Sequence, residues 1–92
     1  MVGRIETYVH SDSITQNKGA TIVKVVSQTD FAAKTPEFIA FCKKAAIMSH
    51  ASNETEWEKV IALFPDLEEM RSNLASTLRE KILVDTIVTV TL

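Results

Sequence analysis

Hydrophobic and polar side chains alternate at both ends of the chain, and this spacing limits the fold more than any other feature. A period of two over residues 4–10 predicts a half-buried strand, and the β-branched run 20–26 predicts a second strand with both faces partly covered. From Ile82 onward the period is two again, which predicts a terminal strand. The fold must therefore bring two strands from the start of the chain together with one from its end.

The middle of the chain has the spacing of helices. Thr35 can cap a helix through its hydroxyl, Pro36 suits the first helical position, and Glu37 is favoured at the positive end of the helix dipole. Hydrophobic residues then recur three and four apart as far as Met48. We therefore expect a first helix that begins near Pro36 and ends near His50.

Two further helices are expected before the terminal strand. Asn53 and Glu56 have the spacing of a capping box, which predicts the start of the second helix. Pro65 is expected to stop this helix, because the residue before a proline is disfavoured in the helical conformation. Asp66 is expected to cap the third helix, with Glu69 in the matching position.

The order of the predicted elements is ββαααβ, which is typical of the α+β class. The polar loop 11–19 ends in Gly19 and predicts a hairpin, so the first two strands are expected to be antiparallel. We expect the terminal strand to complete a three-stranded antiparallel sheet, with the three helices layered on one face. A chain of 92 residues supports one hydrophobic core, so residues 1–92 are expected to form a single domain.

The composition argues against several functional classes. The net charge is −2 and no cluster of basic residues exceeds Lys43-Lys44, so direct binding to nucleic acid is not expected. No apolar stretch approaches the length of a membrane span and no signal peptide is recognised, so no membrane association is expected. Cys42 is the one cysteine of the sequence, so no internal disulfide forms, which is typical of a reducing compartment. We therefore expect a cytoplasmic protein.

A short polar step, Thr29-Asp30-Phe31-Ala32, separates the second predicted strand from the first predicted helix. A large aromatic residue at such a place most often packs beneath the helix that follows. The polar neighbours of Phe31 also allow its ring to project from a rigid corner. Asp30 can cap a turn through its carboxylate. From the residues alone, both interpretations of Phe31 stay open.

The same stretch resembles a motif of a known family. Residues 27–34 read Ser-Gln-Thr-Asp-Phe-Ala-Ala-Lys, which resembles the Thr-Asp-Phe motif of translation elongation factor Ts, close to Cys-Gln-Thr-Asp-Phe-Val-Ala-Lys in that family. The strand before the motif, Glu37-Phe38 in the helix after it, and the β-rich end of the chain resemble the N-terminal half of that family's core domain. The resemblance covers nearly the whole chain and implies a truncated, single-domain relative.

The resemblance implies a partner, elongation factor Tu, and a function as a guanine-nucleotide exchange factor that accelerates GDP release. Such a factor is not an enzyme, and no cofactor or metal of its own is implied. In the family, the Thr-Asp-Phe segment projects into elongation factor Tu and is linked to loss of the bound magnesium ion. Carried over position by position, this implicates Thr29, Asp30, Phe31 and Ala32. The last position is commonly Val, so a little apolar contact area is missing here.

Two other interpretations are weighed against this one. The chain can be a non-catalytic binding module that sequesters elongation factor Tu, or tethers it in a larger assembly, without speeding exchange. It can also be a small thiol enzyme, with Cys42 as nucleophile and His10 or His50 as base. The position of Cys42 on the hydrophobic stripe of its predicted helix favours an inert core thiol instead. One cysteine and two scattered histidines form no zinc pattern, and there is no glycine-rich phosphate loop.

The predicted sheet has one face without helices, and we expect a homodimer through that face. In a regular terminal strand, Ile82, Val84 and Val88 share one face, and Leu83 and Ile87 share the other. Exposed hydrophobic patches on small domains usually bind a partner. The hydrophobic residues expected on the open face are Tyr8, Ile22, Val26, Leu83 and Ile87.

Overall fold

The computed structural model describes residues 2–92. The predicted α+β fold with a three-stranded antiparallel sheet is confirmed, although there are four helices in this part of the chain rather than three. The additional helix, α1, is a single turn formed by the Thr-Asp-Phe corner. The elements are β1 (Val2–His10), β2 (Gly19–Ser27), α1 (Asp30–Ala33), α2 (Pro36–Ser52), α3 (Trp57–Leu63), α4 (Pro65–Leu78) and β3 (Leu83–Thr91).

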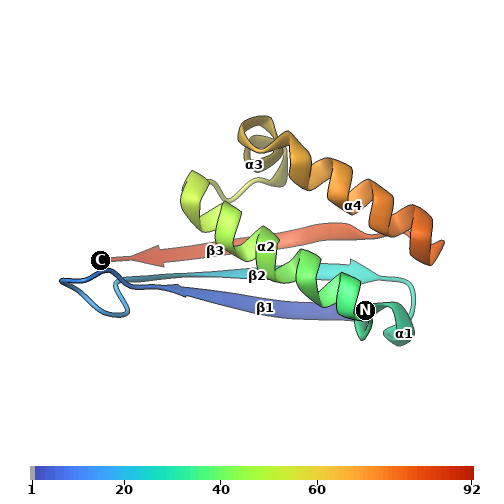
Figure 1. Cartoon of the computed structure of the whole chain (residues 1–92), viewed down its shortest axis with the longest axis horizontal. Coiled ribbons are helices and arrows are strands. Elements are labelled where there is room, and N and C mark those ends of the chain that lie inside the picture. The colour runs from blue at the N-terminus through green and yellow to red at the C-terminus, as the bar shows by residue number, and fades with distance from the viewer. Residues whose placement is uncertain (1) are drawn as a thin grey trace.

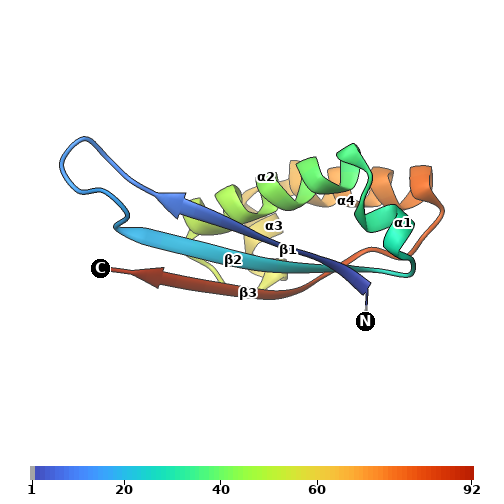
Figure 2. The same ribbon diagram turned by 90° about the horizontal axis from the view of Figure 1, so that it is seen from below.

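The sheet has β2 at its centre, with β1 and β3 antiparallel to it on either side. Figures 1 and 2 show α2, α3 and α4 on one side of the sheet, as expected, and no helix across its other face. The hairpin between β1 and β2 projects from one end of the sheet, and α1 lies at the opposite end. No helix within residues 2–92 is long and apolar enough to cross a membrane.

The helix α2 begins where its sequence predicts. The Thr35 hydroxyl accepts a hydrogen bond from the Phe38 N–H at 3.3 Å, and Pro36 occupies the first turn. The helix ends at Asn53, which adopts a left-handed conformation with φ of 56° and donates its N–H to the His50 carbonyl. A left-handed residue at this position is a common way to satisfy the last carbonyls of a helix.

The predicted caps of the next two helices are wrong. Because Asn53 ends α2, it does not begin α3, and Glu56 precedes α3 without a side-chain cap. Pro65 is the first residue of α4, so one proline both ends α3 and begins α4. Asp66 therefore lies in the first turn of α4 instead of capping it. The observed caps lie two or three residues from the predicted ones, because Asn53 ends α2 and Phe64 both ends α3 and precedes α4.

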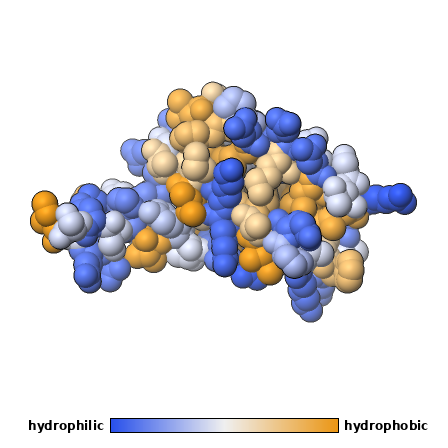
Figure 3. Space-filling model, in the orientation of Figure 1, coloured by the Kyte–Doolittle hydropathy of each residue, from blue (hydrophilic) through white to orange (hydrophobic). Residues whose placement is uncertain are grey.

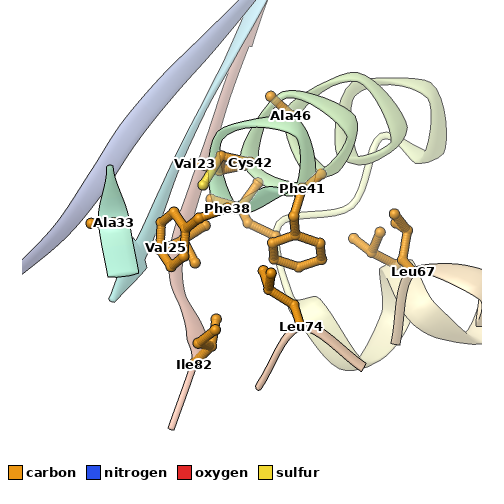
Figure 4. Packing of buried hydrophobic residues seen from close by; sticks show 13 residues of the cluster. Val23, Val25, Ala33, Phe38, Phe41, Cys42, Ala46, Leu67, Leu74 and Ile82 are labelled. Carbon is orange, nitrogen blue, oxygen red and sulfur yellow. The ribbon is translucent and has the colours of Figure 1, made fainter. Parts of the chain in front are cut away.

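The hydrophobic core lies between α2 and the sheet. Phe38, Phe41 and Cys42 of α2 are fully buried, as are Val23 and Val25 of β2. Figure 4 shows the Phe41 ring directed toward two leucines of α4, and the valines of β2 on the other side of α2. Burial of each large hydrophobic side chain contributes about 1.5–3 kcal/mol to folding, so these side chains dominate the stability.

A polar contact joins α3, α4 and the residue that precedes β3 beside this core. The Arg71 guanidinium donates to the Ile82 carbonyl at 2.8 Å and pairs with the Glu68 carboxylate at 2.6 Å. The Trp57 indole N–H donates to the same carboxylate at 3.3 Å. The hydrogen bonds from Arg71 lower the pKa of Glu68, so its carboxylate stays ionised at neutral pH.

The strand β3 is interrupted by a β-bulge, which changes the faces predicted for its residues. Lys24 is opposite Thr86 and Val25 is opposite Val84, so Asp85 is an extra residue of β3 with no residue opposite it on β2. After the bulge, each side chain of β3 points to the face opposite to the one expected for a regular strand. Ile87 is consequently buried in the core, whereas the following Val88 is 46% exposed.

The hairpin between β1 and β2 depends on residues other than Gly19. The left-handed conformation in this loop falls at Asn17, with φ of 52°. The Asp12 carboxylate accepts hydrogen bonds from two backbone N–H groups and from Lys18. Gly19 is needed for space, because a Cβ there would lie 2.9 Å from Cε1 of His50. Figure 3 shows hydrophobic atoms at the tip of this hairpin, where Ile14 is almost fully exposed.

The bulge predicts effects of different size for two adjacent residues. Ile87→Ala should lower the free energy of unfolding by about 2–5 kcal/mol, because it removes buried atoms from the core. Val88→Ala should lower it by less than about 1 kcal/mol, because Val88 lies on the open face. Chemical denaturation followed by Trp57 fluorescence measures both values. The reverse order of the two effects would mean that β3 is regular and that the bulge is absent.

Candidate partner-binding corner

The Thr-Asp-Phe corner is a tight, hydrogen-bonded turn between β2 and α2. Thr29 has an extended backbone and caps α1, because its hydroxyl oxygen accepts from the Ala32 N–H at 3.3 Å. The N–H groups of Lys34 and Thr35 donate to the carbonyls of Phe31 and Ala32, both at 3.2 Å. The chain therefore turns from strand to helix within a few residues.

The Phe31 side chain projects from this turn into solvent. It is 79% exposed, whereas the next two side chains, Ala32 and Ala33, are buried. The interpretation of Phe31 as a core residue beneath α2 is therefore wrong. An exposed aromatic ring on a turn anchored by two buried alanines is suited to contact with another protein.

The remaining residues of the corner have different positions. Asp30 is exposed in the first turn of α1, and the cap is the Thr29 hydroxyl rather than the Asp30 carboxylate. An acidic side chain there is favoured by the positive end of the short helix. Ala32 lies in the interior, so it supports the corner and adds nothing to its surface.

A distant residue, Glu80, contacts the corner, and this contact was not predicted from the sequence. Its carboxylate accepts hydrogen bonds from the N–H groups of Gln28 and Thr29, both at 3.0 Å, and from the Thr29 hydroxyl. The Gln28 side-chain oxygen accepts in return from the Lys81 N–H at 2.8 Å. The hydrogen bond from the Thr29 hydroxyl, together with those from the backbone, lowers the pKa of Glu80.

No sequence signal identified Glu80 in advance. It lies 51 residues after Thr29, in a polar stretch that indicated only the end of a helix. Its place depends on how α4 ends. Arg79 takes a left-handed conformation with φ of 57°, and the Glu80 N–H donates to the Ala75 carbonyl at 3.1 Å. The chain then turns toward the corner.

The residues considered for thiol chemistry are not arranged for it. Cys42 is buried in the core, and burial raises the pKa of its thiol to about 12. The His10 imidazole forms a hydrogen bond with the Tyr8 hydroxyl at 2.8 Å. The His50 imidazole forms one with the Thr21 hydroxyl at 2.9 Å. Among residues 2–92, no three cysteine, histidine or acidic side chains are grouped in a way that could hold a metal ion.

The open face of the sheet differs in composition from the expected patch. Ile22 and Leu83 lie on it, as expected. Tyr8 and Ile87 instead pack against the core on the helix side, and Val26 is nearly buried. The alternation of β1 accounts for Tyr8, and the bulge at Asp85 accounts for Ile87. The exposed hydrophobic residues of the open face are Ile5, Val9, Ile22, Leu83, Val88 and Val90.

The fold and the corner together define an α+β module that presents an aromatic side chain on a hydrogen-bonded turn. No protein-family model matches the sequence. The chain is similar to elongation factor Ts of Rubrobacter xylanophilus, with 44% identity over 45 residues that cover 49% of this chain and 21% of that protein. It is also similar to elongation factor Ts of Finegoldia magna, with 35% identity over 79 residues that cover 73% of this chain and 33% of that protein. The chain thus spans a third or less of the length of these relatives.

The raised pKa of Cys42 predicts an unreactive thiol. At pH 8 the thiol stays protonated, because a buried thiolate is poorly solvated, and the thiolate is the reactive form. An excess of a thiol-specific reagent should modify Cys42 at least about a hundredfold more slowly in the native protein than in a denaturant. Absorbance of the released chromophore measures both rates. Fast modification of the native protein would support the thiol-enzyme interpretation.

Proposed function

We propose that this chain is a guanine-nucleotide exchange factor for elongation factor Tu, in which the Thr-Asp-Phe corner promotes GDP release near the partner's magnesium site. Similarity to two elongation factor Ts proteins supports a role in translation elongation. On this proposal the chain acts in the cytoplasm as a single domain and makes or breaks no covalent bond. The residues proposed to contact the partner are Thr29, Asp30 and Phe31, with Ala32 as their buried support.

The observation that carries this proposal is the exposure of Phe31 on a fixed turn. Binding through an exposed aromatic side chain costs little conformational entropy, because the side chain has few rotatable bonds to fix. The turn beneath Phe31 is held by Thr29 and by two buried alanines, so the ring is presented in a restricted set of positions. Aromatic residues of this kind are common among the few that dominate an interface.

The proposed mechanism needs only a difference in binding free energy. The factor binds the nucleotide-free partner more tightly than the GDP-bound partner, and GDP must then weaken binding of the factor by the same free energy. Insertion of the Phe31 ring favours one packed arrangement of the partner over another. The Asp30 carboxylate beside it can disturb the charge balance at a nearby cation.

A second candidate function is a non-catalytic module that sequesters or tethers elongation factor Tu in a larger assembly. It is favoured by the open sheet face, whose exposed hydrophobic residues offer a second surface for an assembly. A fluorescent-GDP release assay separates the two. Binding without faster release would favour the tether.

We further propose that the open sheet face binds a second copy of this chain. Its exposed hydrophobic residues come from all three strands, and one ion pair, Lys24 with Asp85 at 3.0 Å, lies among them. Two copies related by a twofold axis present the same surface to each other, so the hydrophobic residues of one copy would contact those of the other. The helix side is already occupied by α2, α3 and α4.

Phe31→Ala tests the exchange function. Because the ring is already in water, the melting temperature should change little, while release of fluorescent GDP from elongation factor Tu should lose most of its acceleration. Truncation of a residue that dominates an interface costs about 2 kcal/mol or more, which is about a thirtyfold loss of affinity. Stopped-flow fluorescence measures the rate.

The matched control is Ile14→Ala, which truncates another highly exposed hydrophobic residue, in the hairpin at the far end of the sheet. It should leave both the melting temperature and the release rate unchanged. An unchanged release rate for Phe31→Ala would remove Phe31 from the mechanism. A large fall in its melting temperature would return the residue to a structural role.

Val90→Lys tests the proposed dimer. Val90 is 67% exposed on the open face, so a lysine there should leave the fold intact. In a twofold dimer the two introduced charges should repel each other across the interface. Light scattering at high micromolar concentration should give the mass of a dimer for the unaltered chain and of a monomer for the variant. A monomer for the unaltered chain would refute the proposal.

A further inference from the structure

The corner is joined to a part of the chain that lies far away in the sequence. Three hydrogen bonds from Gln28 and Thr29 reach the Glu80 carboxylate, and one from the Lys81 N–H returns to the Gln28 side chain. The four bonds link the segment that leaves β2 to the segment that leaves α4. They span 51 to 53 residues of sequence.

The Thr29 hydroxyl connects Glu80 to the first turn of α1. It donates to Glu80 and accepts from the Ala32 N–H, so one atom serves both the distant carboxylate and the first turn of α1. The Ser27 hydroxyl also donates to the Thr29 carbonyl at 2.9 Å. The backbone of Phe31 belongs to this turn, but its ring is mostly in solvent and contributes little to the stability of the turn.

Glu80 is itself held on both sides. Its N–H is bonded to Ala75 of α4, and the preceding Arg79 ends that helix in a left-handed conformation. Two residues further on, Ile82 is fully buried in the core. The carboxylate is therefore presented from a short connection between a packed helix and a buried side chain, which fits a fixed support better than a mobile surface group.

We propose that Glu80 is a positioning residue for Phe31: it holds the corner in the conformation that binds the partner. This inference rests on the proposed exchange function for its effect on release, but the positioning itself is independent of any partner. A corner that is already ordered loses less conformational entropy on binding. Without the carboxylate, the N–H groups of Gln28 and Thr29 and the Thr29 hydroxyl lose their common acceptor.

The test compares Glu80→Ala with the unaltered chain in two measurements. Amide hydrogen exchange should accelerate at least about tenfold at Gln28 and Thr29, while exchange at the core residues Val23 and Val25 stays unchanged. The acceleration of GDP release should fall about tenfold, which corresponds to about 1.4 kcal/mol. Glu69→Ala is the matched control, because it removes the same charge from an exposed position on α4.

A graded series and a double variant separate positioning from general stability. Glu80→Gln keeps an oxygen that can accept the two N–H groups but loses the second carboxylate oxygen, so its effects should be intermediate. In a Phe31→Ala background, Glu80→Ala should change the release rate no further, because Glu80 acts through Phe31. Thr29→Ser keeps the hydroxyl that donates to Glu80, so amide exchange at Gln28 should stay as in the unaltered chain.

Several outcomes overturn the inference. Unchanged amide exchange at Gln28 and Thr29 in Glu80→Ala would show that the carboxylate does not hold the corner. Uniformly faster exchange, or an equal loss of release in the Phe31→Ala background, would reduce Glu80 to a general contribution to stability. If the unaltered chain does not accelerate GDP release at all, the proposed function fails, and the amide measurement still decides whether Glu80 holds the corner.

Discussion

The packing of α2 across β2 is the interaction on which the rest of this structure depends. β2 is the central strand of the sheet, with a neighbour on both sides, and its valines Val23 and Val25 lie beneath Phe38 and Cys42 of α2. The helix and the strand are joined by the Thr-Asp-Phe corner, so their contact also sets the distance that the corner must span. Loss of this packing would expose the core and release the turn at the same time, because both depend on the same two elements.

The β-bulge at Asp85 decides which surface the sheet presents. It places Ile87 in the core and Val88 and Val90 on the open face, so one inserted residue both completes the interior and creates an exposed hydrophobic strip. The same residue pairs with Lys24 at 3.0 Å, which keeps a charged pair in the middle of that face. A face of mixed composition is compatible with a reversible contact between copies.

The corner combines a local and a distant contribution. Locally, Thr29 caps one turn of helix and two alanines are buried beside the exposed Phe31 ring. The distant contribution comes from Glu80 at the end of α4, whose carboxylate satisfies backbone groups that would otherwise face solvent. The position of the exposed ring is thereby coupled to the position of α4, and α4 is in turn packed on α2 through Leu67 and Leu74.

The sequence by itself determined the order of the three strands and of α2, α3 and α4, the start of α2 at Thr35 and Pro36, and the motif around Phe31, because these depend on spacing and caps within a few residues. The single turn α1 was not predicted. Only the tertiary structure decided that Phe31 is exposed, that Asp85 forms a bulge, and that Glu80 contacts Thr29. A period of two does not reveal an inserted residue, since both faces of β3 carry hydrophobic side chains. A contact across 51 residues has no local pattern, because it exists only once α4 has ended in a left-handed residue beside the end of β2.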